Sequence, residues 1–168
     1  MKLGFLLLAG VCALTWLPSN GPTSRMETPD GIDTPAVRSV LRAVNELRTK
    51  GCYCPGNKWF GPVEPLRADE RLNRAAQAHA EDMQQRKYFS HRSPEGRSVA
   101  DRADQAGYRW SFIGENIAWG QPTPESVVES WQKSPGHCEN MMRANYQHMG
   151  LGRAATYWVQ MLGSPKRR

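Results

Sequence analysis

The stretch GENIAWG, residues 114–120, completes a segment of high β propensity in the middle of the chain. From Trp110 to Trp119 the sequence reads WSFIGENIAW, which is rich in aromatic and β-branched residues, and Gly120-Gln-Pro follows it directly. Such a run, bounded by turn-forming residues, is typical of a β-strand. We therefore predict a strand that contains Glu115. The remaining elements must pack around this strand.

Helical patterns precede this strand. Thr34-Pro35 begins the first helix, with an N-cap residue followed by proline at the first helical position, and Gly51 ends it. Its apolar stripe has helical spacing and consists of Val37, Val40, Leu41, Val44 and Leu47. Two further helices are predicted, from about Asp69 to Lys87 and from about Ser98 to Ala106. The stretch 51–65 contains several prolines and glycines and is expected to be an irregular loop.

The segments after the strand complete the fold class. Thr123-Pro124-Glu125 begins a fourth helix, which Pro135-Gly136 is expected to end. Two late strands are predicted at residues 147–152 and 157–162. Helices in the first half and strands later indicate an α+β fold, in which helices pack on a small antiparallel sheet.

The N-terminus has the layout of an export signal. Lys2 is followed by an apolar run from Leu3 to Leu17, and the small and turn-forming residues 18–21 come next. Because this run is shorter than the roughly 20 residues of a spanning helix, we interpret residues 1–21 as a signal peptide, with an N-terminal membrane anchor as the alternative. Residues 22–33 are a linker rich in Pro, Thr, Ser and Gly. The predicted location is secreted or periplasmic.

The charge of the chain narrows the class of partner. The formal charge is +6, from 22 Lys and Arg against 16 Asp and Glu. The basic residues are scattered, apart from the terminal Lys166-Arg167-Arg168, and no aromatic residues are interleaved with them as in a stacking platform for bases. We therefore expect no nucleic-acid partner, whereas an anionic lipid or an acidic cell-wall polymer suits such a surface.

Three cysteines belong to the part of the chain after the signal: Cys52, Cys54 and Cys138. In an oxidising compartment two should pair, and Cys52 and Cys54 are too close in sequence to bridge comfortably. The expected disulfide therefore joins Cys138 to one of them, with Cys54 preferred over Cys52. A zinc site built from the three cysteines and His137 is the competing interpretation.

Six stretches in a fixed order resemble the CAP superfamily, which includes cysteine-rich secretory proteins, antigen-five venom proteins and plant pathogenesis-related class-one proteins. More narrowly they resemble its small bacterial exported members. The stretches are AAQAHAEDM (75–83), YFSHRSPEG (88–96), GENIAWG (114–120), SVVESWQKSPGHCENMM (126–142), MGLG (149–152) and YWVQMLG (157–163). This resemblance implies a CAP domain over residues 34–165, folded as an α-β-α sandwich with a central cleft. We expect the chain to be a monomer.

The resemblance also implies which residues line that cleft. His91 matches the family's first cleft histidine, Glu115 its GEN acid and His137 its second histidine. Animal members have another glutamate where this chain has Ser134, so the metal-binding tetrad is incomplete here. Glu129 is near in sequence, but on a helix it faces another direction.

The residue types alone support the same chemistry. Two imidazoles and a carboxylate, His91, His137 and Glu115, suit Zn²⁺ or another divalent cation, with water completing a tetrahedron. The alternative is a set of hydrogen-bonded polar residues that brace loops. Glu115 or Ser134 is expected to orient a histidine ring. His79 lies on the apolar face of its helix, and we interpret it as structural.

Three functional hypotheses follow. The first is an exported binding protein whose cleft takes a lipid, a sterol or a cell-envelope component; these ligand classes come from the resemblance. The second is a hydrolase that uses a metal-activated water or a Ser134–His137 pair. The sequence contains neither HExxH nor G-x-S-x-G, which favours binding over catalysis. The third is a disulfide-stabilised extracellular interaction protein.

Overall fold

The computed structural model describes residues 34–167, so the predicted signal peptide and linker lie outside the described residues. Its helices are α1 (Pro35–Lys50), α2 (Glu70–Arg86), α3 (Val99–Gln105), α4 (Pro124–Gln132) and α5 (Pro135–Met142). Its strands are β1 (Cys52–Cys54), β2 (Lys58–Phe60), β3 (Arg67–Ala68), β4 (Trp110–Trp119), β5 (His148–Ala154) and β6 (Tyr157–Pro165). None of the described helices is long and apolar enough to cross a membrane.

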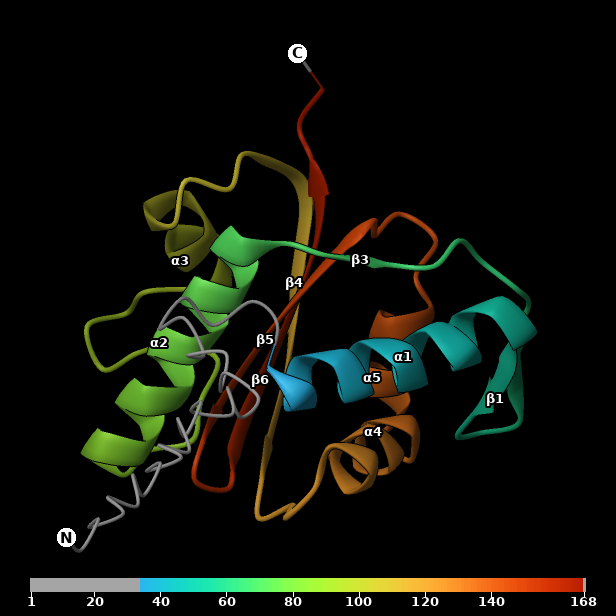
Figure 1. The fold of residues 1–168 in the computed structure, drawn as a ribbon, viewed down its shortest axis with the longest axis horizontal. Helices are drawn as coiled ribbons and strands as arrows, with labels where there is room; N and C mark the ends of the chain where they lie inside the picture. The colour runs from blue at the N-terminus through green and yellow to red at the C-terminus, as the bar shows by residue number, and fades with distance from the viewer. Residues whose placement is uncertain (1–33, 168) are drawn as a thin grey trace, which may run out of the picture.

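A four-stranded sheet forms the middle layer of the molecule, in the order β3-β5-β6-β4. The three long strands pair antiparallel, while the two-residue β3 runs parallel to β5, so the sheet is mixed at this one edge. Helices α2 and α3 cover one face, and α1, α4 and α5 cover the other (Figure 1). This arrangement confirms the predicted α+β class and the α-β-α sandwich.

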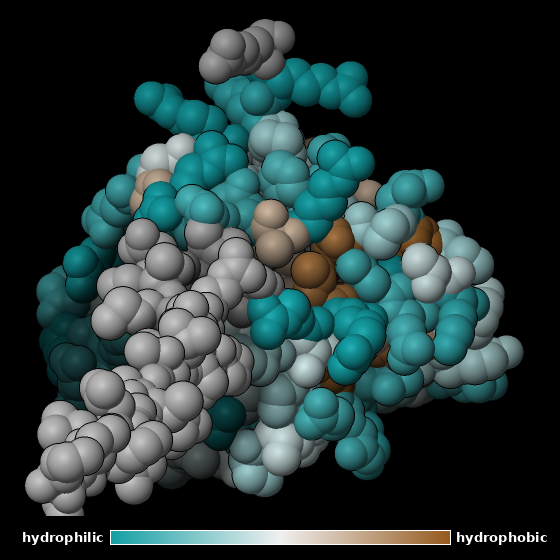
Figure 2. Space-filling model, in the orientation of Figure 1, coloured by the Kyte–Doolittle hydropathy of each residue, from teal (hydrophilic) through white to brown (hydrophobic). Residues whose placement is uncertain are grey.

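Each face of the sheet contributes to its own apolar core. Trp131 of α4 and Trp158 of β6 are fully buried between the sheet and helices α1, α4 and α5. Leu72, Met83 and Tyr108 are fully buried on the other side, beneath α2 and α3. The exterior differs: on the coloured part of the face in Figure 2, hydrophilic side chains predominate, with apolar residues in small patches between them.

The predicted helix starts are confirmed by their caps. The Thr34 hydroxyl accepts a hydrogen bond from the Val37 amide, and Asp69 caps α2 in the same way. Ser98 and Thr123 each begin a helix with a reciprocal capping box.

Two local predictions were wrong. Pro135-Gly136 does not end a helix but begins α5, because proline's fixed φ and missing N–H suit the first turn. The stretch 51–65 is not wholly irregular, since β1 and β2 form a short antiparallel hairpin within it. Its turn includes Asn57 and Gly56, both at positive φ, a conformation that these residue types tolerate.

Two glycines allow α2 to pack directly on β5. A Cβ atom on Gly150 would lie 2.2 Å from the Leu72 carbonyl carbon, and one on Gly152 would lie 2.3 Å from the Ala76 carbonyl carbon. Since these neighbours are backbone atoms of a helix, they cannot move aside separately. The MGLG stretch therefore fixes how closely α2 approaches the sheet.

Gly150→Ala should consequently destabilise the fold, by about 1–3 kcal/mol, because it overpacks the contact between helix and sheet. Gly136→Ala is the matched control, since nothing lies within 4 Å of the added Cβ and its site is helical. Chemical denaturation with circular dichroism measures both. Equal stability of the two variants would show that α2 does not rest on the glycine backbone.

Candidate functional site

The four predicted cleft residues come from three parts of the fold. His91 lies in the loop between α2 and α3, and Glu115 lies in the middle of β4. Ser134 is the N-cap residue of α5, and His137 lies in the first turn of that helix. Because β4 is at one edge of the sheet, residues from both helical layers can meet beside it.

Glu115 is buried and both its oxygens are engaged. Its side chain is 2% exposed. One oxygen, Oε1, lies 2.9 Å from Nδ1 of His91, and the other, Oε2, accepts a hydrogen bond of 2.7 Å from Nη2 of Arg102. The carboxylate therefore fixes the imidazole ring of His91, whose side chain is 55% exposed. No described residue hydrogen-bonds to Nε2 of His91, which leaves that nitrogen as the ring's open ligand position.

Arg102 is the residue that the sequence reasoning missed. Its side chain is 7% exposed, and besides Glu115 it donates to the carbonyl oxygens of Arg97 and His91, each at 3.0 Å. It thus compensates the buried carboxylate and holds the loop that carries His91. A signal existed: Val99, Arg102, Ala103 and Ala106 share one face of the predicted helix, where a lone arginine among apolar positions implies a buried partner.

His137 is half-buried on the other side of β4. Burial lowers the pKa of His137, and the nearby charge of His91 lowers it further. Its imidazole is therefore neutral at neutral pH, the form that binds metals. The backbone carbonyl of His137 accepts a hydrogen bond of 3.2 Å from Nδ2 of Asn116, which also donates to Gln160 at 2.9 Å. Asn116 thus anchors the start of α5 to the sheet.

Within residues 34–167, the side chain of Ser134 has no hydrogen bond that would support a catalytic role. Its side chain makes no cap hydrogen bond to α5, and no hydrogen bond joins it to His137 among the described residues. A serine nucleophile needs a base within hydrogen-bond reach. The geometry therefore gives no support to the Ser134–His137 pair.

The disulfide prediction is confirmed for the preferred pairing. Cys54 is bonded to Cys138, with a Cα–Cα distance of 5.7 Å, and Cys52 is free and buried. This bond uses two of the sulfurs that the competing zinc site would need. It connects the β1–β2 hairpin to α5, one residue after His137.

The family model for CAP, described as the cysteine-rich secretory protein family, matches residues 41–161. This chain belongs to the CAP family. Two Bacillus subtilis (strain 168) proteins are similar in sequence: YkwD, 40% identical over 100 residues, and the membrane protein YlbC, 30% identical over 129 residues. These alignments cover 58% and 77% of the chain, but only 39% and 34% of the relatives, so the CAP chain spans little more than a third of each.

Several solved structures show the same fold. An extracellular SCP-domain protein of Bacillus anthracis gives a TM-score of 0.69 at 24% identity, over 82% of this chain and 44% of that one. An outer surface protein of Borrelia burgdorferi gives a TM-score of 0.67 at 23% identity, over 80% of this chain and 97% of that one. The structure of NaASP2 with Zn²⁺ gives a TM-score of 0.55 at 16% identity, over 81% of this chain and 83% of that one. At these identities the likeness shows the fold alone.

The geometry of a zinc site can be compared with the side chains of this CAP domain. A tetrahedral zinc site holds its ligand atoms about 3.3 Å apart, because its bonds are about 2 Å long. Among the described residues, only the sulfurs of the three cysteines gather as a trio within 4.8 Å of one another. In this structure the two oxygens of Glu115 contact the His91 ring and Arg102, so the observed role of Glu115 is to orient that ring.

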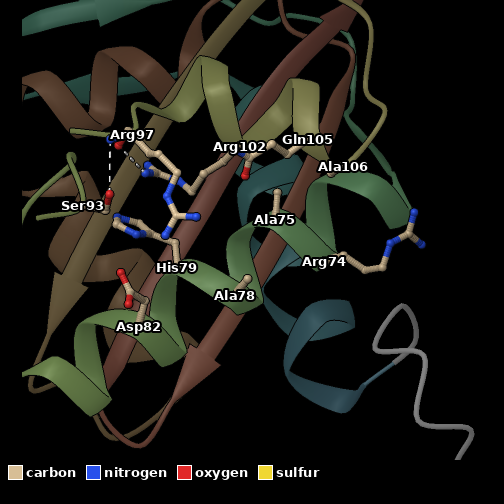
Figure 3. A pocket seen from close by; sticks show the side chains of 10 residues that line it. All are labelled: Arg74, Ala75, Ala78, His79, Asp82, Ser93, Arg97, Arg102, Gln105 and Ala106. Atoms are coloured by element: carbon tan, nitrogen blue, oxygen red, sulfur yellow. Dashed lines mark hydrogen bonds between the residues drawn. The ribbon is translucent and has the colours of Figure 1, made fainter. Parts of the chain in front are cut away.

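A pocket lies between α2 and α3 (Figure 3). It contains none of the predicted cleft residues but borders them through Arg102. His79, 2% exposed at this pocket, lies 3.0 Å from the Ser90 carbonyl, which agrees with its predicted structural role. The lining residues are Arg74, Ala75, Ala78, His79, Asp82, Ser93, Arg97, Arg102, Gln105 and Ala106.

The electrostatic link between the two cleft histidines can be measured. His91→Gln removes the smaller of the two causes that lower the pKa of His137, so this pKa should rise but stay below its usual value, because burial remains. NMR titration of the His137 ring follows the change, with His148→Gln as control. Since the folded pKa is lowered, the stabilising contribution of neutral His137 should be complete above about pH 6.5 and decline below it. An unchanged pKa in His91→Gln would place the two rings too far apart to share a ligand.

Proposed function

We propose that this CAP chain is an exported binding protein, secreted or periplasmic, whose cleft of His91, Glu115, Ser134 and His137 takes an extracellular ligand with the help of a divalent cation such as Zn²⁺. The observation that carries this proposal is the arrangement Arg102–Glu115–His91, in which a buried carboxylate orients an exposed imidazole. Carboxylates orient metal-binding histidines in the same way in many proteins. Export is supported by the N-terminal pattern and by the extracellular and surface relatives.

The roles of the residues follow from their contacts. His91 would bind the cation through Nε2, and His137 through its neutral ring. Glu115 holds the ring of His91, and Arg102 holds Glu115. A bound divalent cation would supply a positive charge for an oxygen-bearing ligand. NaASP2, a CAP-fold protein solved with Zn²⁺, makes zinc the first cation to test.

Aromatic side chains beside the cleft suggest what kind of ligand it accepts. Trp119 follows Glu115 by four residues in β4, so both lie on the same face of the strand. It is 59% exposed and lies near Phe89, which is 47% exposed, with ring centroids 6.5 Å apart. An apolar shoulder beside a polar cleft, on a chain of charge +6, suits an amphiphilic or anionic envelope component: a lipid, a sterol-bearing membrane or a wall polymer.

Zinc binding tests the metal part of the proposal. One Zn²⁺ per chain should bind to the oxidised protein, and His91→Ala or His137→Ala should abolish binding. Glu115→Gln keeps the shape but weakens the orienting contact, and should cost about 10- to 100-fold in affinity. Calorimetry in the Cys52→Ser background excludes binding to the free thiol.

Glu129→Gln is the matched control. Glu129 is an exposed glutamate that pairs with Lys133 and does not touch the cleft, so its variant should bind zinc as the parent does. Equal affinity of Glu115→Gln and Glu129→Gln would remove Glu115 from the site. A parent protein that binds no zinc would refute the metal-binding part of the proposal.

Ligand binding is tested separately. The protein is sedimented with anionic phospholipid vesicles, with cholesterol-containing vesicles and with insoluble cell-wall fragments. We expect retention on one of the three, reduced in the His91→Ala/His137→Ala double variant and in Trp119→Ala. Retention that both variants leave unchanged would assign binding to another surface, and retention on none would overturn the proposed ligand class.

A further inference from the structure

The three cysteines of this chain lie in one buried cluster. Cys52 and Cys54 are two residues apart in β1, so the pleat directs both to the same side, toward Cys138 of α5. All three sulfur atoms lie within 4.8 Å of one another. Cys54 and Cys138 form the disulfide, and Cys52 remains a thiol beside it.

The surroundings of the cluster shield it from solvent. Cys138 is completely buried and Cys52 is 7% exposed, and the apolar side chains around them include Met142, Leu47 and Phe60. Burial also raises the pKa of the Cys52 thiol. The nearest reactive partners of each sulfur are therefore the other two sulfurs of the cluster, and exchange among them should be slow.

We propose that Cys52, Cys54 and Cys138 form an internal thiol–disulfide exchange site, at which Cys52 displaces Cys54 from Cys138. Cys52 loses its proton and attacks the sulfur of Cys138. The Cys52–Cys138 bond forms while the Cys54–Cys138 bond breaks, and Cys54 leaves as a thiolate that takes up a proton. One disulfide and one thiol are present before and after, so the step needs no oxidant or reductant.

The reach of the side chains permits this step. A change of rotamer moves a cysteine sulfur by about 3 Å, which covers the gap from 4.8 Å to a disulfide bond of about 2 Å. The backbone must adjust as well. The Cα atoms of bonded cysteines lie about 4.4–6.8 Å apart, as those of Cys54 and Cys138 do at 5.7 Å. Cys52 lies about 6.6 Å along the strand from Cys54, so its Cα atom must come within the same range of Cys138.

The exchange would move the attachment of α5 by one pleat along β1. The hairpin has two strands of three residues, and within residues 34–167 no third strand pairs with it, so it can shift without disturbing the main sheet. The exposed ion pair of Lys58 with Glu139, at 3.0 Å, also connects the hairpin to α5. Exposed ion pairs stabilise little, so this contact would not prevent the shift. Because His137 precedes Cys138, its ring would move relative to His91; this consequence for the cleft rests on the proposed function.

Two variants lock the alternatives. Cys52→Ser leaves only the Cys54–Cys138 bond, and Cys54→Ser leaves only a bond between Cys52 and Cys138. We expect Cys54→Ser to form that bond fully, as shown by disulfide mapping with mass spectrometry after alkylation of free thiols. Two free thiols in a folded Cys54→Ser protein would overturn the proposal. Circular dichroism monitors folding.

The unaltered chain gives an independent measurement. It is incubated in mildly alkaline buffer without added thiol, quenched with acid and mapped. Both disulfides should be found, with the Cys52–Cys138 form growing to a constant fraction. Mapping that finds Cys54–Cys138 alone at all times would refute the exchange, whatever the folding of the variants.

The effect on the cleft is measured on the two locked variants. The NMR signals of the His137 ring should differ between them without any metal, and zinc affinity should differ by about 10-fold, as for other changes around metal ligands. Different ring signals with no zinc binding in either variant would support the link between the exchange site and the cleft, and would refute metal binding. Identical ring signals would refute the link between the exchange site and the cleft.

Discussion

The buried ion pair of Arg102 with Glu115 is the contact on which the candidate cleft depends. Glu115 is 2% exposed within β4, and removing one partner of such a pair typically costs about 3–5 kcal/mol, because the remaining charge is uncompensated. Arg102 supplies the compensation at 2.7 Å and holds two carbonyl groups of the 91–97 loop with the same guanidinium. The folding of α3 therefore positions both the acid and the loop that carries His91.

The position of β4 explains why the candidate site lies where it does. This strand is an edge of the sheet, opposite the β3 edge, so one of its sides has no strand to pair with. His91 reaches it from the α2 and α3 layer, and His137 reaches it from the layer of α1, α4 and α5. The GEN motif supplies the acid that contacts the first histidine and the amide, Asn116, that anchors the second. One short stretch of sequence thus joins the two layers.

Features with local causes were predictable from the sequence. The caps at Thr34, Asp69, Ser98 and Thr123 act within one helical turn, so their residue types alone indicate where helices begin. The β4 segment was predictable for the same reason, since its composition favours a strand wherever it packs. The pairing of Cys54 with Cys138 was only preferred over that of Cys52, because two cysteines on one face of a strand reach the same partner.

Features that depend on distant partners were not predictable. The sequence alone shows Arg102 as one charged residue on a short helix, because its carboxylate partner lies on the distant strand β4. Pro135-Gly136 is compatible with either end of a helix, and only the packing of α5 determines that a helix begins there. Glu115 shows the same limit within the site. Its type and motif predict a metal ligand, which stays a prediction, whereas its contacts with Arg102 and His91 depend on segments of the chain that only folding brings together.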